Sequence, residues 1–302
     1  MVMINVELKG GAVKEFENGT TPAEIAKSIG AGLYKSVCCA KVDGDLCDLR
    51  TPLGKDCKVE LLTFDNVDGQ KTFWHTASHV LAQAVKRLYP NAKCAIGPAV
   101  DNGFYYDFDV EKPFSPEDLE KIKAEMKKIV KSGLELERVE LSPEEAEKKL
   151  EEMNEPYKVE LVKEHSDKGE HITFYKQGEF IDLCAGPHLM SVAPIKAIEL
   201  TACTGAYWRG DANNAQLCRV YGVAFPKASM LEEHLKKLEE AKLRDHNKLG
   251  RELEYFTTVD YVGQGLPILL PKGARVVQLL QRWVEDVEQS KGCLLTKTPL
   301  LA

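Results

Sequence analysis

The sequence predicts an α+β protein composed of several domains, and three observations support this class. The chain has 302 residues, which is too long for one ordinary hydrophobic core. Short segments with strand-like alternation are interspersed with segments of helical periodicity. Hydrophobic residues make up 44% of the chain and charged residues 29%, a composition typical of soluble globular proteins.

Charge and cysteine content narrow the class of protein further. The net charge of −7 excludes a generally basic nucleic-acid binder, so any RNA contact must come from local basic patches. The nine cysteines include no Cys-x-x-Cys pair, which favours a reduced protein with mostly buried thiols. The N-terminus lacks the pattern of a signal peptide, and no uncharged apolar run approaches the length of a membrane span. We therefore expect a cytoplasmic protein with no membrane partner.

Residues 1–64 are predicted to form a small mixed unit. The first eight residues alternate in polarity as a half-buried strand does, and a second strand returns after a Gly-Gly turn. Thr21-Pro22-Ala23-Glu24 carries the cap, first-turn proline and acidic residue of a helix start, and Gly30 ends that helix. Strands are expected near 37–42 and 59–64, with a turn at Asp43-Gly44. This order is that of a ubiquitin-like β-grasp module.

Residues 65–227 are predicted to form a second α+β domain. The polar stretch 65–71 is interpreted as a linker, and a helix follows through Leu88. Ser-Pro pairs at 115–116 and 142–143 open two charged helices. Strands are expected at 103–109 and near 158–162, 172–175 and 220–224.

Two shorter regions complete the chain. Residues 228–250 have apolar positions at helical spacing and are predicted to form an amphipathic linker helix. Within 251–302, a strand at 266–271, a helix through Gln289 and a strand from Leu294 are expected. These elements are too few to bury their own apolar faces, so we expect this last region to be the truncated start of a larger domain.

Two pairs of residues carry the chemistry. His75 and His79 stand four positions apart on a predicted helix, so their rings project from the same face. Thr76 occupies the position where a metalloprotease helix has its glutamate base, which disfavours that class. Cys184 and His188 flank a Gly-Pro turn after a predicted strand.

Together, His75, His79, Cys184 and His188 offer nitrogen and sulfur donors suited to tetrahedral zinc. The same residues also suit a metal-free site that positions a water molecule and moves its protons. Residue types alone leave both interpretations open.

Several motifs resemble those of bacterial threonyl-tRNA synthetases, in order along the chain. They are Gly97-Pro98 with Asp101-Asn-Gly-Phe-Tyr-Tyr-Asp107, Asp182-Leu-Cys-Ala-Gly-Pro-His188, Gly205-Ala-Tyr-Trp-Arg-Gly-Asp211 followed by Asn213-Asn214, and Gly265-Leu-Pro-Ile-Leu-Leu-Pro-Lys-Gly-Ala274. The resemblance implies a TGS domain at 1–64, an editing domain at 65–227, and a linker helix at 228–250. It also implies that 251–302 begins the antiparallel-sheet core of a class II synthetase and ends within that class's first motif, which normally builds a dimer interface.

The family resemblance implies two activities for the parent enzyme. Its ligase core attaches threonine to tRNA with ATP, magnesium and zinc, and the residues that bind these groups lie beyond this sequence. Serine differs from threonine by one methyl group, worth roughly 1–3 kcal/mol, so a second site must remove serine attached in error. We therefore expect these 302 residues to hydrolyse seryl-tRNA of threonine specificity without ligating threonine. The implied partner is the acceptor end of tRNA; the parent is expected to be a homodimer and this chain a monomer.

The resemblance also suggests roles for individual residues. His75 is expected to contact the terminal ribose and handle a proton, and Lys158 to stabilise charge or assist water activation. Cys184 and His188 are expected to position the water, with His79 completing the wall of the site. The remaining candidates are substrate-contacting or RNA-stacking residues: Asp182, Tyr106, Tyr207, Trp208 and Arg209.

Two alternative functions remain open at the level of sequence. One is a non-catalytic module that binds the tRNA acceptor end for a partner ligase. The other is a free-standing editing factor of the alanyl type, which the β-grasp module and the ligase-like C-terminal region disfavour.

Overall fold

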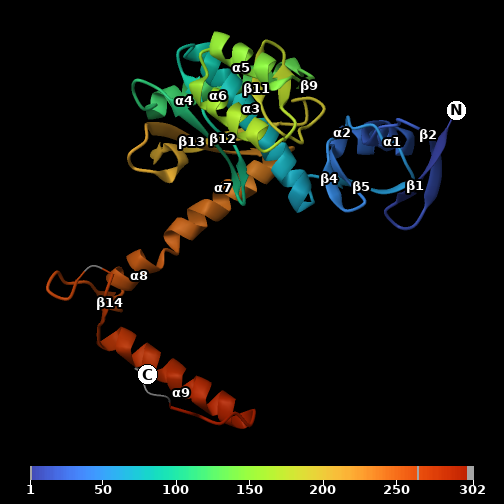
Figure 1. The fold of residues 1–302 in the computed structure, drawn as a ribbon. Coiled ribbons are helices and arrows are strands. Elements are labelled where there is room, and N and C mark those ends of the chain that lie inside the picture. The colour runs from blue at the N-terminus through green and yellow to red at the C-terminus, as the bar shows by residue number, and fades with distance from the viewer. Residues whose placement is uncertain (1, 264, 298–302) are drawn as a thin grey trace. The chain divides into compact units, whose positions relative to one another are not determined.

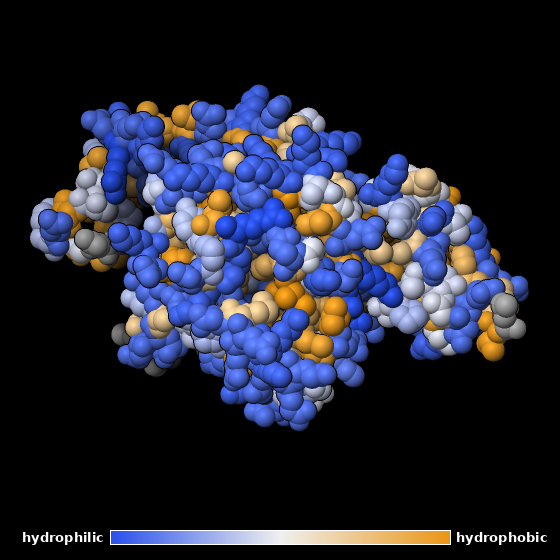
Figure 2. Space-filling view, turned by 90° about the horizontal axis from the view of Figure 1, so that it is seen from above, coloured by the Kyte–Doolittle hydropathy of each residue, from blue (hydrophilic) through white to orange (hydrophobic). Residues whose placement is uncertain are grey.

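The computed structural model of the chain describes residues 2–263 and 265–297 (Figure 1). The chain divides into two compact units, Met1–Glu232 and Glu233–Ala302. Both helices and several separate sheets are present, which confirms the mixed α+β class. No helix among the described residues is long and apolar enough to cross a membrane. Figure 2 shows a face that is largely hydrophilic, with smaller apolar areas scattered between polar side chains.

A five-stranded sheet in the order β2-β1-β5-β3-β4 forms the N-terminal part of the first unit. β1 and β5 pair in parallel at its centre, and the other neighbouring strands pair antiparallel. The alternation of the first strand is confirmed, because Ile4 and Val6 are buried in the core under α1. The elements are β1 (Met3–Leu8), β2 (Val13–Glu17), α1 (Pro22–Ile29), α2 (Ala31–Ser36), β3 (Val37–Val42), β4 (Asp45–Cys47) and β5 (Cys57–Thr63).

The helix α3 (Val67–Leu88) begins earlier than the sequence indicates, so the expected linker at 67–71 is wrong. Its first turn contains Asp68 and Gly69, which are poor helix formers in isolation. Tertiary packing explains the difference. A Cβ atom on Gly69 would lie 2.0 Å from the carbonyl oxygen of Thr63, so only glycine lets the helix approach the end of β5 this closely.

A second five-stranded sheet packs against α3, and the main hydrophobic core includes side chains from both. Its order is β12-β13-β8-β6, with β7 paired to β8, and α3 contacts both β8 and β13. The aromatic side chains of Phe104, Tyr106 and Phe108 from β8 are buried in this core. The strands are β6 (Lys93–Cys94), β7 (Ala99–Val100), β8 (Gly103–Asp109), β12 (Ala197–Tyr207) and β13 (Gln216–Phe225), and the short helix η1 (Trp208–Gly210) follows β12.

The two charged helices begin where the sequence predicts. The side chains of Ser115 and Ser142 each accept a hydrogen bond from the backbone amide three residues later. The carboxylate at that position accepts one from the backbone amide of the serine. They cap α4 (Pro116–Ser132), which packs on α3, and α5 (Pro143–Glu152), which packs on α6 (Pro156–Asp167). A three-stranded antiparallel sheet completes this region: β9 (Leu136–Glu140), β10 (Thr173–Gln177) and β11 (Phe180–Leu183).

The strand expected near 158–162 is wrong, because these residues lie within the helix α6. Their apolar and polar residues alternate briefly, which suggests a strand over so short a window. Pro156 at the first helical position starts the helix instead, and Lys158 and Val162, four residues apart, share its buried face. The helix α6 therefore carries Lys158.

The expected linker helix is interrupted. α7 (Ala228–Leu243) ends before Arg244, and Asp245 caps a separate helix, α8 (His246–Glu252), by accepting a bond from the Lys248 amide. The second unit also contains the strands β14 (Phe256–Thr257) and β15 (Ile268–Leu269) and the expected long helix α9 (Pro271–Ser290). Residues 294–297 form no strand, and the rest of the strand expected from Leu294 lies outside the described residues.

Candidate functional site

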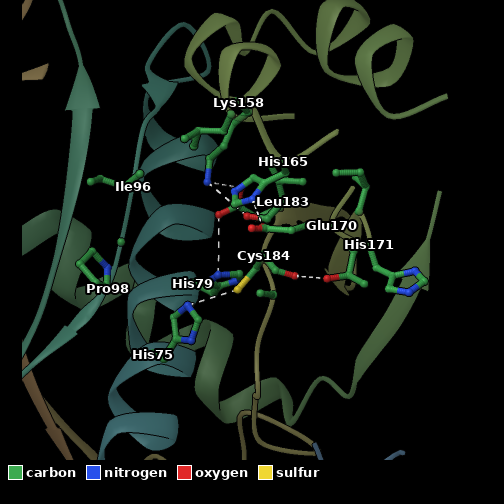
Figure 3. A pocket seen from close by; sticks show the side chains of 16 residues that line it. His75, His79, Ile96, Pro98, Lys158, His165, Glu170, His171, Leu183 and Cys184 are labelled. Atoms are coloured by element: carbon green, nitrogen blue, oxygen red, sulfur yellow. Dashed lines mark hydrogen bonds and ion pairs between the residues drawn. The ribbon is translucent and has the colours of Figure 1, made fainter. Parts of the chain in front are cut away.

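The helix α3 and the loop after β11 bring the two sequence motifs together. His75 and His79 project from the same face of α3, with ring centroids 5.3 Å apart. The ring of His188 lies 4.3 Å from that of His75 and 4.2 Å from that of His79. Figure 3 shows His75, His79 and Cys184 converging at one end of the pocket, while Lys158 enters from α6. The predicted four-residue cluster therefore exists in space.

Cys184 lies at the centre of the cluster. Its Sγ atom is 3.2 Å from Nε2 of His75 and 3.2 Å from Nε2 of His188. The amide of Gly186 also donates to this sulfur over 3.2 Å. Burial raises the pKa of Cys184 to about 12, so the group is a neutral thiol at physiological pH. A neutral thiol is a hydrogen-bond donor here and a poor nucleophile.

The hydrogen bonds of Thr76 determine the tautomer of His188. The Thr76 hydroxyl donates to the carbonyl of Thr72, so its oxygen accepts from the Leu189 amide and from Nδ1 of His188. His188 therefore carries its proton on Nδ1, and its Nε2 is free to accept the thiol proton of Cys184.

His75 is the ring in the cluster with capacity left for a substrate. Its Nε2 atom lies 3.2 Å from the Sγ atom of Cys184, and the proton of that thiol is directed to His188. One thiol proton cannot serve both His75 and His188, so His75 can accept a hydrogen bond from water or a substrate hydroxyl. Its side chain remains partly accessible from the pocket.

A buried ion pair next to His79 forms another part of the wall of the site. Nζ of Lys158 lies 2.8 Å from Oδ1 of Asp182, and both side chains are about 95% buried. The hydroxyl of Tyr106 donates to Oδ2 of Asp182 over 2.6 Å. Burial opposes both charges, but each partner outweighs it, which lowers the pKa of Asp182 and raises that of Lys158. The pair is therefore ionised despite its burial.

The pocket between these walls has a volume of about 370 Å³. All the catalytic residues proposed from the sequence except His188 line it. His188 is fully buried behind Cys184, and its Nε2 atom lies 3.2 Å from the Cys184 Sγ atom. Four further lining residues, Gly97, Pro98, Leu183 and Ala185, belong to motifs noted in the sequence but had no role assigned to them. Sequence reasoning missed the other lining residues, namely Ile96, Leu161, His165, Glu170, His171, Ile172 and Thr173, because no short motif marks them.

The expected substrate-contacting residues divide into two groups. Tyr106 is completely buried and bonds Asp182, so it supports the site from behind and does not line the pocket. Trp208 is buried too, and its Nε1 donates to Glu160. Arg209 pairs with Glu160 and Glu164 of α6 and lies over the Trp208 ring, while Tyr207 remains exposed. None of the three aromatic or basic residues at 207–209 lines the pocket.

The cluster of His75, His79, Cys184 and His188 is a group that could hold a metal ion. One donor atom from each residue lies within 4.8 Å of the others. Nδ1 of His79 is buried without a hydrogen-bond partner among the described residues, as a nitrogen reserved for a ligand would be.

The buried histidines should make stability depend on pH. Burial lowers the pKa of His79 from 6.5 to about 3 and that of His75 to about 4, and it lowers the pKa of His188 well below 6.5. Between these values and pH 6.5 the unfolded chain binds protons that the folded chain does not. The contribution of these histidines to the unfolding free energy should therefore be complete above pH 6.5. It should fall toward pH 4, by about 1.4 kcal/mol per pH unit for each histidine.

Urea unfolding monitored at pH 7.5, 6.5 and 5.5 measures this slope. The His79→Gln variant should show a shallower slope, whereas His246→Gln, at an exposed position of α8, should match the unmodified chain. An unfolding free energy that stays constant across this range would show that the histidines titrate normally in the folded state.

Comparison with known proteins agrees with the sequence motifs. Residues 4–63 match the family model of the TGS domain. Residues 172–221, which include Asp182, Cys184 and His188, match the model described as the threonyl and alanyl tRNA synthetase second additional domain.

Similar proteins cover almost the whole chain. A threonine–tRNA ligase of Clostridium perfringens is 58% identical over 300 residues, which is 99% of this chain and 46% of that protein. Proteins of the same name from Clostridium botulinum and Acetivibrio thermocellus are 56% and 52% identical over 99% of this chain, covering 46% and 47% of their own length. The chain thus spans just under half the length of these curated relatives.

Proposed function

We propose that the pocket of this chain hydrolyses seryl-tRNA of threonine specificity, because the chain is similar to the N-terminal region of threonine–tRNA ligases and matches the second additional domain of threonyl and alanyl tRNA synthetases. The observation that carries the proposal is the ionised Lys158–Asp182 pair facing His75 and Cys184 in one pocket. This arrangement places a positive charge, a proton acceptor and a neutral thiol around a cavity.

The proposed reaction is attack of water on the ester that joins serine to the terminal ribose. The water oxygen bonds to the carbonyl carbon, the ester bond to the ribose oxygen breaks, and that oxygen takes a proton. Serine and free tRNA are released. Negative charge develops on the carbonyl oxygen during the attack, so a fixed positive charge nearby lowers the barrier.

Lys158 is the group best placed to supply that charge. Two of its three N–H bonds are directed to Asp182 and to the carbonyl of Leu183, which is 3.5 Å away. The third is available to the pocket that Lys158 lines. Asp182 keeps the ammonium charged and fixes its position, so we propose that it orients Lys158 while its remaining lone pairs face the seryl amine or hydroxyl.

His75 is proposed to accept a hydrogen bond from the terminal ribose or the attacking water. Its low pKa keeps the ring neutral, so an acceptor nitrogen is present throughout the physiological range. Cys184 and His188 are proposed to position the attacking water, with the Cys184 thiol bonded to His188 and not acting as a nucleophile. His79 closes the wall next to Asp182, its Nε2 lying 3.7 Å from Oδ2.

A deacylation assay tests the proposal directly. Seryl-tRNA of threonine specificity should lose its serine faster than threonyl-tRNA loses threonine or alanyl-tRNA loses alanine. Binding of tRNA with no hydrolysis would support the non-catalytic acceptor module instead, and preference for alanine tRNA would support the alanyl-type editing factor.

Zinc is the metal that the four-residue cluster fits. The three imidazoles and one thiol are donors that zinc accepts in tetrahedral sites, and the unpartnered Nδ1 of His79 adds to this fit. A zinc ion held by all four residues would have no open position, whereas one held by three of them could polarise a carbonyl or a water molecule. The hydrogen bonds of Cys184 and the charge of Lys158 offer the same functions through the chain itself.

Removal of metal is therefore expected to leave hydrolysis intact. We expect the chain treated with a chelator to deacylate seryl-tRNA at the rate of the untreated chain, because Lys158 and His75 already provide the charge and the acceptor. Zinc content measured by elemental analysis, with rates before and after chelation, checks this. A loss of rate that zinc alone restores would assign an essential role to the metal.

The wider activity of the relatives is also a proposal for this chain. We propose that in a longer protein these residues serve an ATP-dependent threonine–tRNA ligase of the cytoplasm, whose ligase core uses magnesium and a further zinc ion. The helix α9 exposes Val276, Leu280, Trp283 and Val284 within the described second unit, which fits the expected role of its motif in homodimer formation. Sedimentation of the longer protein tests that role.

A further inference from the structure

A short turn of the N-terminal β-grasp domain reaches the proposed hydrolytic site from behind. The turn is Asp48-Leu49-Arg50, which follows β4. Leu49 is fully buried in the core of its own domain, and its carbonyl accepts a bond from the amide of Ala23 at the start of α1. The turn is therefore anchored at its centre, and the side chains on either side of Leu49 extend to the second domain.

Asp48 bonds the backbone of His188 directly. Its Oδ2 atom accepts from the His188 amide over 3.2 Å and from the Tyr175 hydroxyl over 2.8 Å. Tyr175 in turn packs its ring 4.4 Å from the His188 imidazole. Both Asp48 and Tyr175 are buried, so neither bond competes with bulk water.

Arg50 bonds the carbonyl groups of His188 and Leu189 and that of Leu136 in β9. Its guanidinium donates to the carbonyls of Leu136 at 3.0 Å, Leu189 at 2.7 Å and His188 at 3.4 Å. It is also paired with Asp48 at 3.0 Å. A planar guanidinium with five donors suits several carbonyls at fixed angles, and a lysine ammonium would not reproduce this geometry.

The backbone of His188 and Leu189 is thus held by side chains rather than by a helix or a sheet. Asp48 binds the His188 amide, Arg50 binds both carbonyls, and Thr76 binds the Leu189 amide. Met190, the next residue, packs against the core of the β-grasp domain. Every polar backbone group of this pair has a partner, and three of those four bonds come from the N-terminal domain.

We infer that Asp48 and Arg50 are positioning residues of the hydrolytic site, so that the β-grasp domain is a structural part of that site. They act through His188, whose Nε2 must lie within reach of the Cys184 thiol. This inference rests on the proposed hydrolysis for its effect on rate, while its effect on His188 is independent of any reaction.

The Asp48→Ala variant of the whole chain tests the inference. It leaves the His188 amide and the Tyr175 hydroxyl unpartnered, so the imidazole should shift relative to Cys184. We expect kcat for deacylation of seryl-tRNA to fall about tenfold to a hundredfold, with KM changed less than about twofold, because such misplacement affects reaction geometry more than binding. Asp48→Asn retains an acceptor oxygen and should recover part of the rate.

Asp45→Ala is the matched control, because Asp45 is an exposed residue in the preceding strand β4. Nitrogen-15 NMR of the His188 ring provides a readout that needs no substrate. Its signals should move in Asp48→Ala and in Arg50→Lys but not in Asp45→Ala. Thermal unfolding of each variant verifies that the comparison is made on folded protein.

The outcomes separate the two proposals. Wild-type kcat and unchanged His188 signals in Asp48→Ala would overturn the positioning role and leave the hydrolytic function standing. If the unmodified chain hydrolyses no mischarged tRNA while the His188 signals still respond to Asp48→Ala, the hydrolytic function fails and the positioning role stands.

Discussion

The Lys158→Met variant is expected to lose about 3–5 kcal/mol of unfolding free energy, because it leaves Asp182 as a buried charge without its partner. Asp182 is only 4% exposed, and its other bonds come from the Tyr106 hydroxyl and the more distant His79. Hydrolysis should fall to background in the same variant, since the positive charge beside the ester is gone. Denaturant unfolding and a deacylation assay measure the two effects.

A second variant separates stability from chemistry. Lys158→Met combined with Asp182→Asn removes both charges and keeps an acceptor for Tyr106. We expect it to regain most of the lost stability, because a neutral buried pair carries no uncompensated charge. Hydrolysis should stay at background. Activity that returned together with stability would show that Lys158 serves the fold alone.

Lys163→Met is the matched control for this experiment. Lys163 lies on the same helix α6 and pairs with Glu147 at 3.9 Å, but its side chain is 58% exposed. Solvent screens such a pair, so its loss should change the unfolding free energy by less than about 1 kcal/mol.

The His75→Ala variant is expected to lower kcat for seryl-tRNA hydrolysis by about 10²–10⁴, the usual contribution of a positioned proton-transfer group. The protein should remain folded, because Cys184 keeps its hydrogen bond to His188 when the second imidazole is removed. Single-turnover deacylation with excess protein measures the chemical step without interference from product release.

His246→Ala controls for the loss of a histidine as such. His246 begins α8 and is exposed, outside the residues that line the pocket. It should hydrolyse seryl-tRNA at the unmodified rate. If His75→Ala behaves like His246→Ala, the proton-handling role belongs to another residue of the pocket.

Local sequence patterns predicted much of the secondary structure for identifiable reasons. The Ser-Pro helix starts at 115 and 142 and the alternating strand at the N-terminus depend on interactions within a few residues, so a short window contains the needed information. The errors at 67–71 and 158–162 have the opposite cause. Gly69 is helical because it packs against Thr63, and α6 forms because its buried face meets α5 and the pocket wall.

The same division applies to the site. The sequence by itself determined the donor types, the four-residue spacing that places His75 beside His79, and the Cys-x-x-x-His motif, because these are properties of covalent order. Only the tertiary structure decided that Lys158 and Asp182 form a buried ion pair, that Thr76 sets the tautomer of His188, and that Asp48 and Arg50 hold the loop behind it. Those contacts join residues 24 to 140 positions apart, and burial supplies the low polarity that makes the histidines neutral and the ion pair strong.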